Sequence, residues 1–141
     1  MKLSTKGRYG VQALFELALH EGAGPVSLKL IAERQALSEH YLEQLAAPLR
    51  KAGLITSVRG AQGGYILGRP AARITVGDVL RVLEGPLDAD EEEPGAAASP
   101  TSDVWRRVRQ AIIDVVDSIT LADLVAEAHE QIARQNLTFS I

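Results

Sequence analysis

The chain has 141 residues, enough for one ordinary domain or for one small domain with an extension. A hydrophobic fraction of 46% and a charged fraction of 23% are typical of globular proteins and exclude general disorder. The sequence contains no cysteine, which excludes disulfide scaffolds, cysteine-ligated zinc, iron–sulfur clusters and thiol nucleophiles. It shows no membrane-spanning apolar run and no signal peptide, so we expect a cytoplasmic protein with no membrane partner. Its three histidines are far apart in the sequence, and we expect no metal and no other cofactor.

The net charge of −3 hides a strong asymmetry between the two halves of the chain. Residues 1–70 hold nine Lys or Arg against five Glu, a balance of +4. Residues 71–141 hold six Arg against thirteen acids, a balance of −7, and five of those acids fall between Asp88 and Glu93. Such an asymmetry indicates two parts with different partners, the first of them compatible with nucleic acid.

Three helices are expected in the basic half. Apolar residues three and four positions apart predict the first helix over residues 5–21. Ser27 is the expected N-cap of a short helix that ends near residue 35, and Ser38 that of a longer third helix. Pro48 removes one backbone hydrogen bond from the third helix, which therefore either continues with a kink or ends near residue 47.

A glycine-rich segment, LITSVRGAQGGYILG, follows over residues 54–68 and predicts two short strands joined by a tight turn. Thr75 and Asp78 then have the spacing of a capping box, which predicts a fourth helix. This order of elements is that of a winged helix-turn-helix domain, with the helix-turn-helix at about 27–52 and the wing at the glycine-rich hairpin. We therefore predict a mainly α-helical fold with a small β wing in residues 1–85.

The acidic half is predicted to contain a linker, a long helix, a final helix and a tail. Residues 86–100, rich in acids and proline, are expected to be a flexible linker. Residues 101–119 have apolar side chains spaced three and four apart, Trp105, Val108, Ile112, Val115 and Ile119. Two heptads do not establish a coiled coil, so this apolar stripe predicts either packing on its own domain or a dimerisation helix. Thr120 and Asp123 form a second capping box, before a helix to about residue 133.

A winged helix-turn-helix places the start of its third helix in the major groove of DNA and its wing beside the backbone or in a groove. The candidate DNA-binding residues are therefore Lys2, Ser4, Lys6, Arg8, Tyr9, Lys29, Ser38, Glu39, His40, Tyr41, Glu43, Gln44, Arg59, Gly60 and Gln62. A carboxylate can accept a hydrogen bond from cytosine, and an amide can pair with adenine. Taken singly, each polar residue is also compatible with an ordinary solvated helix surface, and the two tyrosines with core aromatics.

The motifs STKGRYG, LSEHYLEQL, PLRKAGL and VRGAQGGYILG resemble the Rrf-type winged helix-turn-helix transcription regulators, and the similarity continues over nearly the whole chain. The resemblance implies a homodimeric repressor on inverted-repeat operators in double-stranded DNA, with the apolar stripe as the dimer interface. Cluster-binding members carry three cysteines after the fourth helix, where this chain has none, so we expect no iron–sulfur cluster. The segments LEGP, WRRVR and DSITLADL most resemble the branch that represses cysteine-metabolism genes.

That resemblance also implies a protein partner, cysteine synthase. The last residues, QNLTFSI, show no helical pattern, so we expect a free tail in which Phe139 and the terminal carboxylate of Ile141 enter the enzyme's cleft. A frayed end without a role is the alternative. An enzyme is not expected, because no acid pair, catalytic triad or phosphate loop is found. The rival function is a winged helix that regulates an enzyme without binding DNA.

Overall fold

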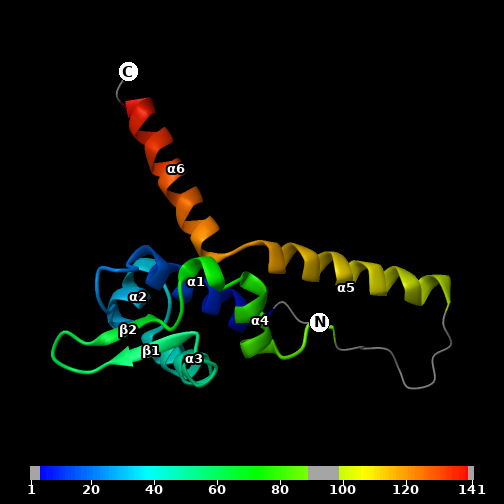
Figure 1. Ribbon diagram of the computed structural model, residues 1–141, viewed down its shortest axis with the longest axis horizontal. Coiled ribbons are helices and arrows are strands. Elements are labelled where there is room, and N and C mark those ends of the chain that lie inside the picture. Colours follow the sequence, from blue (N-terminus) through cyan, green and yellow to red (C-terminus); the bar gives the residue numbers. More distant parts are fainter. Residues whose placement is uncertain (1–3, 89–98, 140–141) are drawn as a thin grey trace.

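The computed structural model describes residues 4–88 and 99–139 (Figure 1). Its elements in chain order are α1 (Thr5–Leu19), α2 (Leu28–Gln35), α3 (Glu39–Lys51), β1 (Ile55–Val58), β2 (Gly64–Leu67), a 3-10 turn η1 (Ala71–Arg73), α4 (Val76–Glu84), α5 (Pro100–Ser118) and α6 (Leu121–Phe139). The body of the molecule consists of α1 to α4 and the hairpin, while α5 and α6 project from it in different directions (Figure 1). The predicted fold, mainly helical with a small β wing, is confirmed.

Hydrogen bonds at the helix starts explain why the first elements lie where the sequence predicts them. The Ser27 hydroxyl accepts from the Leu30 N–H at 3.1 Å, and the Ser38 hydroxyl from the Tyr41 N–H at 3.3 Å. Thr75 and Asp78 bond reciprocally as a capping box. The third helix continues through Pro48 to Lys51, so the alternative of an end near residue 47 is wrong.

The hydrophobic core lies between α1, α3, α4 and the base of the wing. Leu14 of α1, Leu45 of α3 and Val79 of α4 are each at most 1% exposed. Leu121, the first residue of α6, is also fully buried in this core. The helix-turn-helix and the first residue of α6 therefore share one packed interior. A close-packed interior has few voids, so it transmits a displacement from one element to the next.

The wing is fixed to the helix-turn-helix by a third backbone pairing. The strands β1 and β2 are antiparallel, with Ile55 opposite Leu67. Val26, just before α2, exchanges two backbone hydrogen bonds with Tyr65 of β2, at 2.9 and 2.8 Å. A Cβ atom on Gly64 would lie 2.3 Å from the Val26 carbonyl oxygen, so only glycine permits this approach. The pairing sets the position of the wing relative to α2.

The structure corrects two boundaries. The expected linker begins later than predicted, because Leu87 is apolar and packs into the body at 2% exposure. It also ends earlier, because Ser99 caps α5 and Pro100 occupies its first turn, while residues 89–98 lie outside the described residues. The expected absence of helix from residue 135 onward is wrong: α6 continues to Phe139, because no glycine or proline interrupts residues with adequate helix propensity.

Candidate nucleic-acid interface

The outward face of α3 is polar and open to solvent. His40 and Glu43 expose 82% and 61% of their side chains, and their Nδ1 and Oε2 atoms lie 4.0 Å apart. Gln44 is exposed and its Nε2 lies 3.5 Å from His40 Nε2. Glu39 is exposed in the first turn, whereas the Ser38 hydroxyl is occupied as the cap. Three of the predicted base-contacting side chains therefore share one accessible surface.

Two cations that the sequence argument did not select extend this face. Arg50 and Lys51 are exposed in the last turn of α3. They follow Glu43 and Gln44 by seven residues, two helical turns, and so lie on the same side of the helix. That spacing was the available signal. Cations at the far end of α3 are suited to the phosphates that flank a major groove.

The tip of the wing presents one cation among small residues. Arg59, Gly60 and Gln62 are all exposed in the loop between β1 and β2. The Gly63 N–H donates to the Gly60 carbonyl at 3.0 Å, and Gly60 has a left-handed φ of 123°, which closes the turn. The wing lies beside α3, on the side of the body away from α6 (Figure 1). Arg59 is thus carried on a narrow projection from the same body as α3.

Some of the predicted DNA-binding residues near the amino terminus are exposed, and one is bonded within the body. Lys6 and Arg8 are exposed on α1, as Lys29 is on α2. The Ser4 hydroxyl donates a hydrogen bond to Glu84 of α4, whose carboxylate also accepts from the Gly7 N–H. In the structure Ser4 therefore connects the start of α1 to α4. Lys2 lies outside the described residues.

The two tyrosines pack against each other at the junction of α1 and α3. The rings of Tyr9 and Tyr41 meet edge to face, with centroids 5.6 Å apart, and both side chains are half-buried against the core. They are positioned to hold α3 against α1. Their contact with DNA remains a prediction.

A buried carboxylate that the sequence argument missed holds α2 against α1. Glu16 of α1 is 1% exposed and accepts hydrogen bonds from Arg34 Nε at 2.8 Å, Gln35 Nε2 at 3.0 Å and His20 Nε2 at 2.9 Å. Burial by itself raises the pKa of Glu16, but the hydrogen bonds from Arg34, Gln35 and His20 outweigh it and hold the pKa below its ordinary value of 4.5. The carboxylate is therefore charged and satisfied beneath the helix-turn-helix.

Glu16→Gln is expected to lower the free energy of unfolding by about 1–3 kcal/mol at pH 7, because it removes charge-assisted hydrogen bonds in a buried site. The folded-state pKa of Glu16 is depressed, so its stabilisation is present above pH 4.5 and lost as the pH falls further. Urea unfolding at pH 7 and pH 3 measures the difference between wild type and variant, which should shrink at pH 3. The exposed Glu33→Gln serves as the control; an equal effect there would contradict the assignment.

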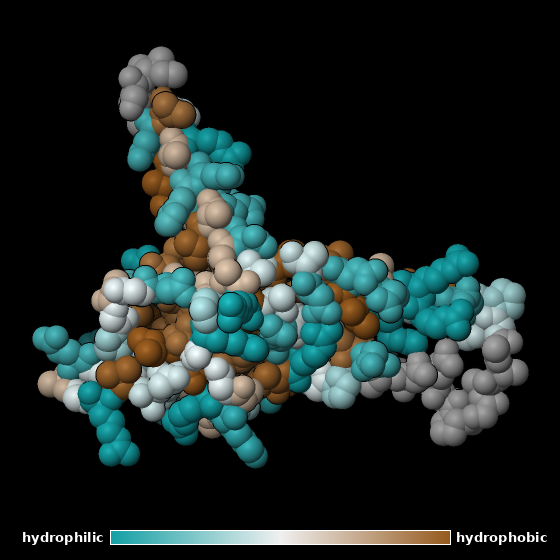
Figure 2. Space-filling view, in the orientation of Figure 1, coloured by the Kyte–Doolittle hydropathy of each residue, from teal (hydrophilic) through white to brown (hydrophobic). Residues whose placement is uncertain are grey.

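The apolar stripe predicted on α5 is open to solvent in the single chain. Trp105, Val108 and Val115 are 63%, 44% and 56% exposed. Six of the nine large apolar residues exposed in the described part of the chain lie on α5 or α6, and apolar residues are visible along α6 in Figure 2. Ile119 is placed differently from the prediction: it caps the end of α5, is half-buried, and its carbonyl accepts from the Val76 N–H.

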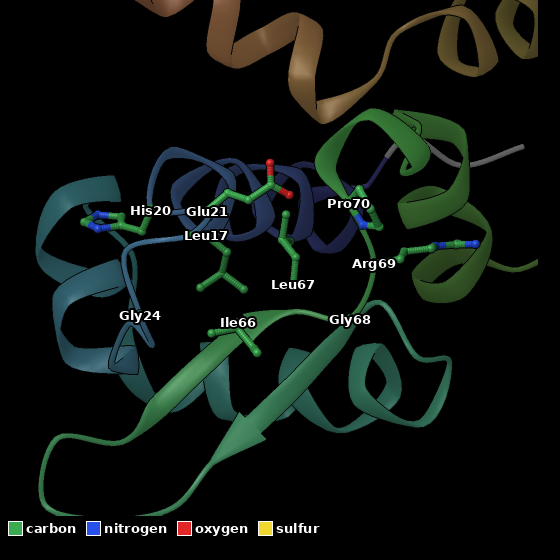
Figure 3. Close-up of a pocket in the computed structure, with 10 residues that line it drawn as sticks. Leu17, His20, Glu21, Gly24, Ile66, Leu67, Gly68, Arg69 and Pro70 are labelled. Carbon is green, nitrogen blue, oxygen red and sulfur yellow. The ribbon is translucent and has the colours of Figure 1, made fainter.

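A cavity of about 450 Å³ lies between the end of α1 and β2 (Figure 3). Leu17, Ile66 and Leu67 point into it, and Glu21 at its rim accepts a hydrogen bond from the Ala71 N–H at 2.8 Å. Its lining includes no residue of α3 and none of the wing tip. The cavity is therefore separate from the candidate DNA-binding surface.

Comparison with known proteins decides the family. A sequence model of the Rrf2 family, described as an iron-dependent transcriptional regulator, matches residues 3–127. The chain belongs to the Rrf2 family. The HTH-type transcriptional regulator CymR of Bacillus subtilis is 52% identical over 130 residues, which cover 89% of this chain and 91% of that protein. The protein rrf2 of Nitratidesulfovibrio vulgaris is 45% identical over 134 residues, 91% of this chain and 89% of that protein.

Solved structures of Rrf2 relatives have the same fold. The structure of CymR, described as the global cysteine regulator of B. subtilis, superposes with a TM-score of 0.83 over 90% of this chain and 98% of that one, at 52% identity. That of T. potens IscR gives 0.80 over 93% and 90%, at 58% identity. The winged-helix fold and the likeness to CymR are thus confirmed, and these relatives are transcriptional regulators, not enzymes.

The donor set of this Rrf2 chain does not fit the iron that the family description implies. The sequence has no cysteine, and its three histidines are His20, His40 and His129. Within the described ranges no three His, Asp or Glu side chains gather as a metal-binding group. Iron–sulfur clusters require thiolates, and His20 is already bonded to Glu16. The residues present in the described ranges therefore do not form a site for an iron–sulfur cluster. Among the described helices, none has the length and apolarity to cross a membrane.

Proposed function

We propose that the protein is a homodimeric, sequence-specific DNA-binding repressor that works without an iron–sulfur cluster. The observation that carries this proposal is the exposed polar face of α3, with His40, Glu43 and Gln44, beside a glycine wing that presents Arg59. Major-groove recognition needs such side chains near the start of the recognition helix. The exposed cations of α1, α2 and α3 supply phosphate contacts despite the net negative charge of the chain.

The dimer is proposed to form through the apolar stripe of α5. The exposed side chains of Trp105, Val108 and Val115, with the half-buried Ile112 in the same row, are costly in water. Burial against a second copy removes about 25 cal/mol of cost for each Å² covered. In a dimer with a two-fold axis at α5, the two copies of α3 and of the wing are related by that axis. Two recognition helices related in this way require an operator with inverted half-sites about one helical turn apart or more.

A mobility shift of the full chain on sheared DNA from the source organism tests DNA binding. We expect bound fragments at moderate salt, with an affinity that falls steeply as salt rises, since counterions are released from the contacted phosphates. Selected fragments should share an inverted repeat. Absence of any shift, together with capture of an enzyme, would support the rival function of a protein-interaction module.

Glu43→Ala is expected to relax base preference more than it weakens binding. The variant removes one acceptor from the outward face of α3, where a matched contact contributes about 1–3 kcal/mol of discrimination. Competition between the selected operator and operators altered at single positions measures the change, which should be confined to one position in each half-site. Glu33→Ala, an exposed acid on α2, is the control. Unaltered discrimination by Glu43→Ala would remove Glu43 from the proposed contact set.

The regulated genes are proposed to serve cysteine or sulfur metabolism, with cysteine synthase as the signalling partner. Support comes from the likeness to the cysteine regulator CymR over most of both chains. Ile141 and the side chain of Phe139 lie outside the described residues, so capture of the terminal carboxylate rests on sequence alone. Calorimetry with a purified cysteine synthase tests it: deletion of Ile141 should abolish binding, and Ser140→Ala should not. Equal affinity with and without Ile141 would refute this route.

A further inference from the structure

The long helix α5 is attached to the body at its carboxyl end. No residue of α5 is buried, and most of the helix extends away from the body (Figure 1). At its end the Ile119 carbonyl accepts from the Val76 N–H at 2.9 Å, and the Leu121 N–H donates to the Ile74 carbonyl at 2.9 Å. These two bonds form a short antiparallel bridge between Thr75 and Thr120. The direction of α5 is consequently set where it meets α4.

A two-pronged ion pair reinforces this meeting point. Arg81 of α4 donates from both terminal nitrogens to the two carboxylate oxygens of Asp117 in α5, each at 2.7 Å. The hydrogen bonds raise the pKa of Arg81 and lower that of Asp117, so both groups remain charged. A planar guanidinium bonded in this way restricts the orientation of the carboxylate as well as its distance.

A glycine in α4 makes room for that carboxylate. A Cβ atom on Gly77 would lie 2.0 Å from Asp117 Oδ1, so a larger residue would displace α5 or break the ion pair. Gly77 is the second residue of α4, and the close approach of this neighbour is a physical reason for a glycine there. On the opposite side α4 packs closely on α1, where a Cβ on Gly10 would lie 2.1 Å from Leu83 Cδ1. The helix α4 is therefore tightly seated on both α1 and α5.

The ion pair and the apolar stripe lie on different faces of α5. Asp117 follows Val115 by two residues and Ile112 by five, which rotates it well away from the stripe around the helix. One face of α5 is thus available to a second copy while another is bonded to α4. A rigid relation between the two recognition helices of a dimer passes through the carboxyl end of α5, where this ion pair and the Thr75–Thr120 bridge both join it to α4.

We propose that the joint formed by Gly77, Arg81 and Asp117 fixes the spacing between operator half-sites that the dimer accepts. This inference rests on the proposed function of a dimeric DNA-binding protein. Each base pair added between two half-sites rotates one of them by about 34° and shifts it by about 3.4 Å. A stiff joint rejects that change, because α3 cannot follow the displaced half-site. A loosened joint lets each DNA-binding body reorient on its α5, and the spacing requirement relaxes.

The test uses the full chain and a duplex that carries the inverted repeat selected by the wild-type protein. Matched duplexes have one or two base pairs added to or removed from the spacer. We expect wild type to lose about tenfold or more in affinity for each altered spacer, as for other misplaced contacts. In Asp117→Asn and Gly77→Ala this penalty should shrink to about threefold or less. The double exchange Arg81→Asp with Asp117→Arg should restore the wild-type penalty, and Asp114→Asn, off the joint, should leave it unchanged.

The outcomes separate this inference from the proposed function. A wild-type protein that selects no inverted repeat overturns the dimeric function and the joint's role with it. A wild type with strict spacing and an equally strict Asp117→Asn overturns the joint alone. Sedimentation must show the variants as dimers; dissociation of Asp117→Asn would also overturn the proposal, since the joint lies apart from the stripe. Folding should survive, because the ion pair is partly exposed and contributes little stability.

Discussion

Trp105→Asp is expected to convert the dimer into monomers and to reduce operator affinity by about a hundredfold or more. Trp105 is 63% exposed in the single chain and lies within the apolar stripe of α5, so its substitution leaves the folded body intact. In a dimer the same position is covered, and a carboxylate there would be desolvated without a partner. Loss of one half-site contact removes much of the binding energy of a two-site complex.

Sedimentation velocity and a mobility shift measure the two consequences of Trp105→Asp separately. Gln110→Asp is the matched control, because five residues rotate it to the opposite side of α5, where it is exposed. The control should sediment and bind as wild type does. A Trp105→Asp protein that remains dimeric at micromolar concentration would contradict the assignment of the stripe as the dimer interface.

Arg59→Ala is expected to weaken operator binding by about tenfold or more and to lower the slope of log affinity against log salt by about one per wing. Arg59 is exposed on a closed glycine turn that is held to the body through the Val26–Tyr65 pairing, so its position is largely organised before DNA arrives. An organised cation loses less conformational entropy on binding than a free one.

Titrations of Arg59→Ala at several salt concentrations provide the measurement, with Arg73→Ala as the control. Arg73 is also exposed but lies in η1, outside the wing. Comparison of specific and unrelated DNA tells whether Arg59 contacts phosphate, with equal losses on both, or bases, with a larger loss on the operator. Wild-type affinity in Arg59→Ala would show that the wing does not contact DNA.

The parts of the fold that depend on neighbours a few residues apart could be predicted. The caps Ser27 and Ser38 and the box at Thr75 act within one helical turn, so their spacing is sufficient. The exposure of Arg50 and Lys51 on the outward face of α3 could also have been predicted, because they follow the predicted contacts Glu43 and Gln44 by seven residues. Periodicity failed for the end of α6, where Gln135 interrupts the apolar pattern although residues 135–139 include no glycine or proline.

Contacts between distant residues could not be predicted in this way. Arg34 reaches Glu16 across 18 positions, and Arg81 reaches Asp117 across 36. In the sequence each of these four is an ordinary charged residue of an amphipathic helix, and only packing decides which faces meet. Gly77, in the first turn of α4, carried a local hint, because glycine is favoured where a neighbour comes too close for a Cβ atom.

A hydroxyl-radical footprint of the full chain on its selected DNA tests the central claim most directly. The account predicts protection on both strands with two-fold symmetry, in two half-sites at least about one helical turn apart. It also predicts that Arg59→Ala loses the protection at positions contacted by the wing, while Arg73→Ala keeps it. A footprint without two-fold symmetry, or no protection at moderate salt, would contradict the account of a dimer that binds DNA through α3 and the wing.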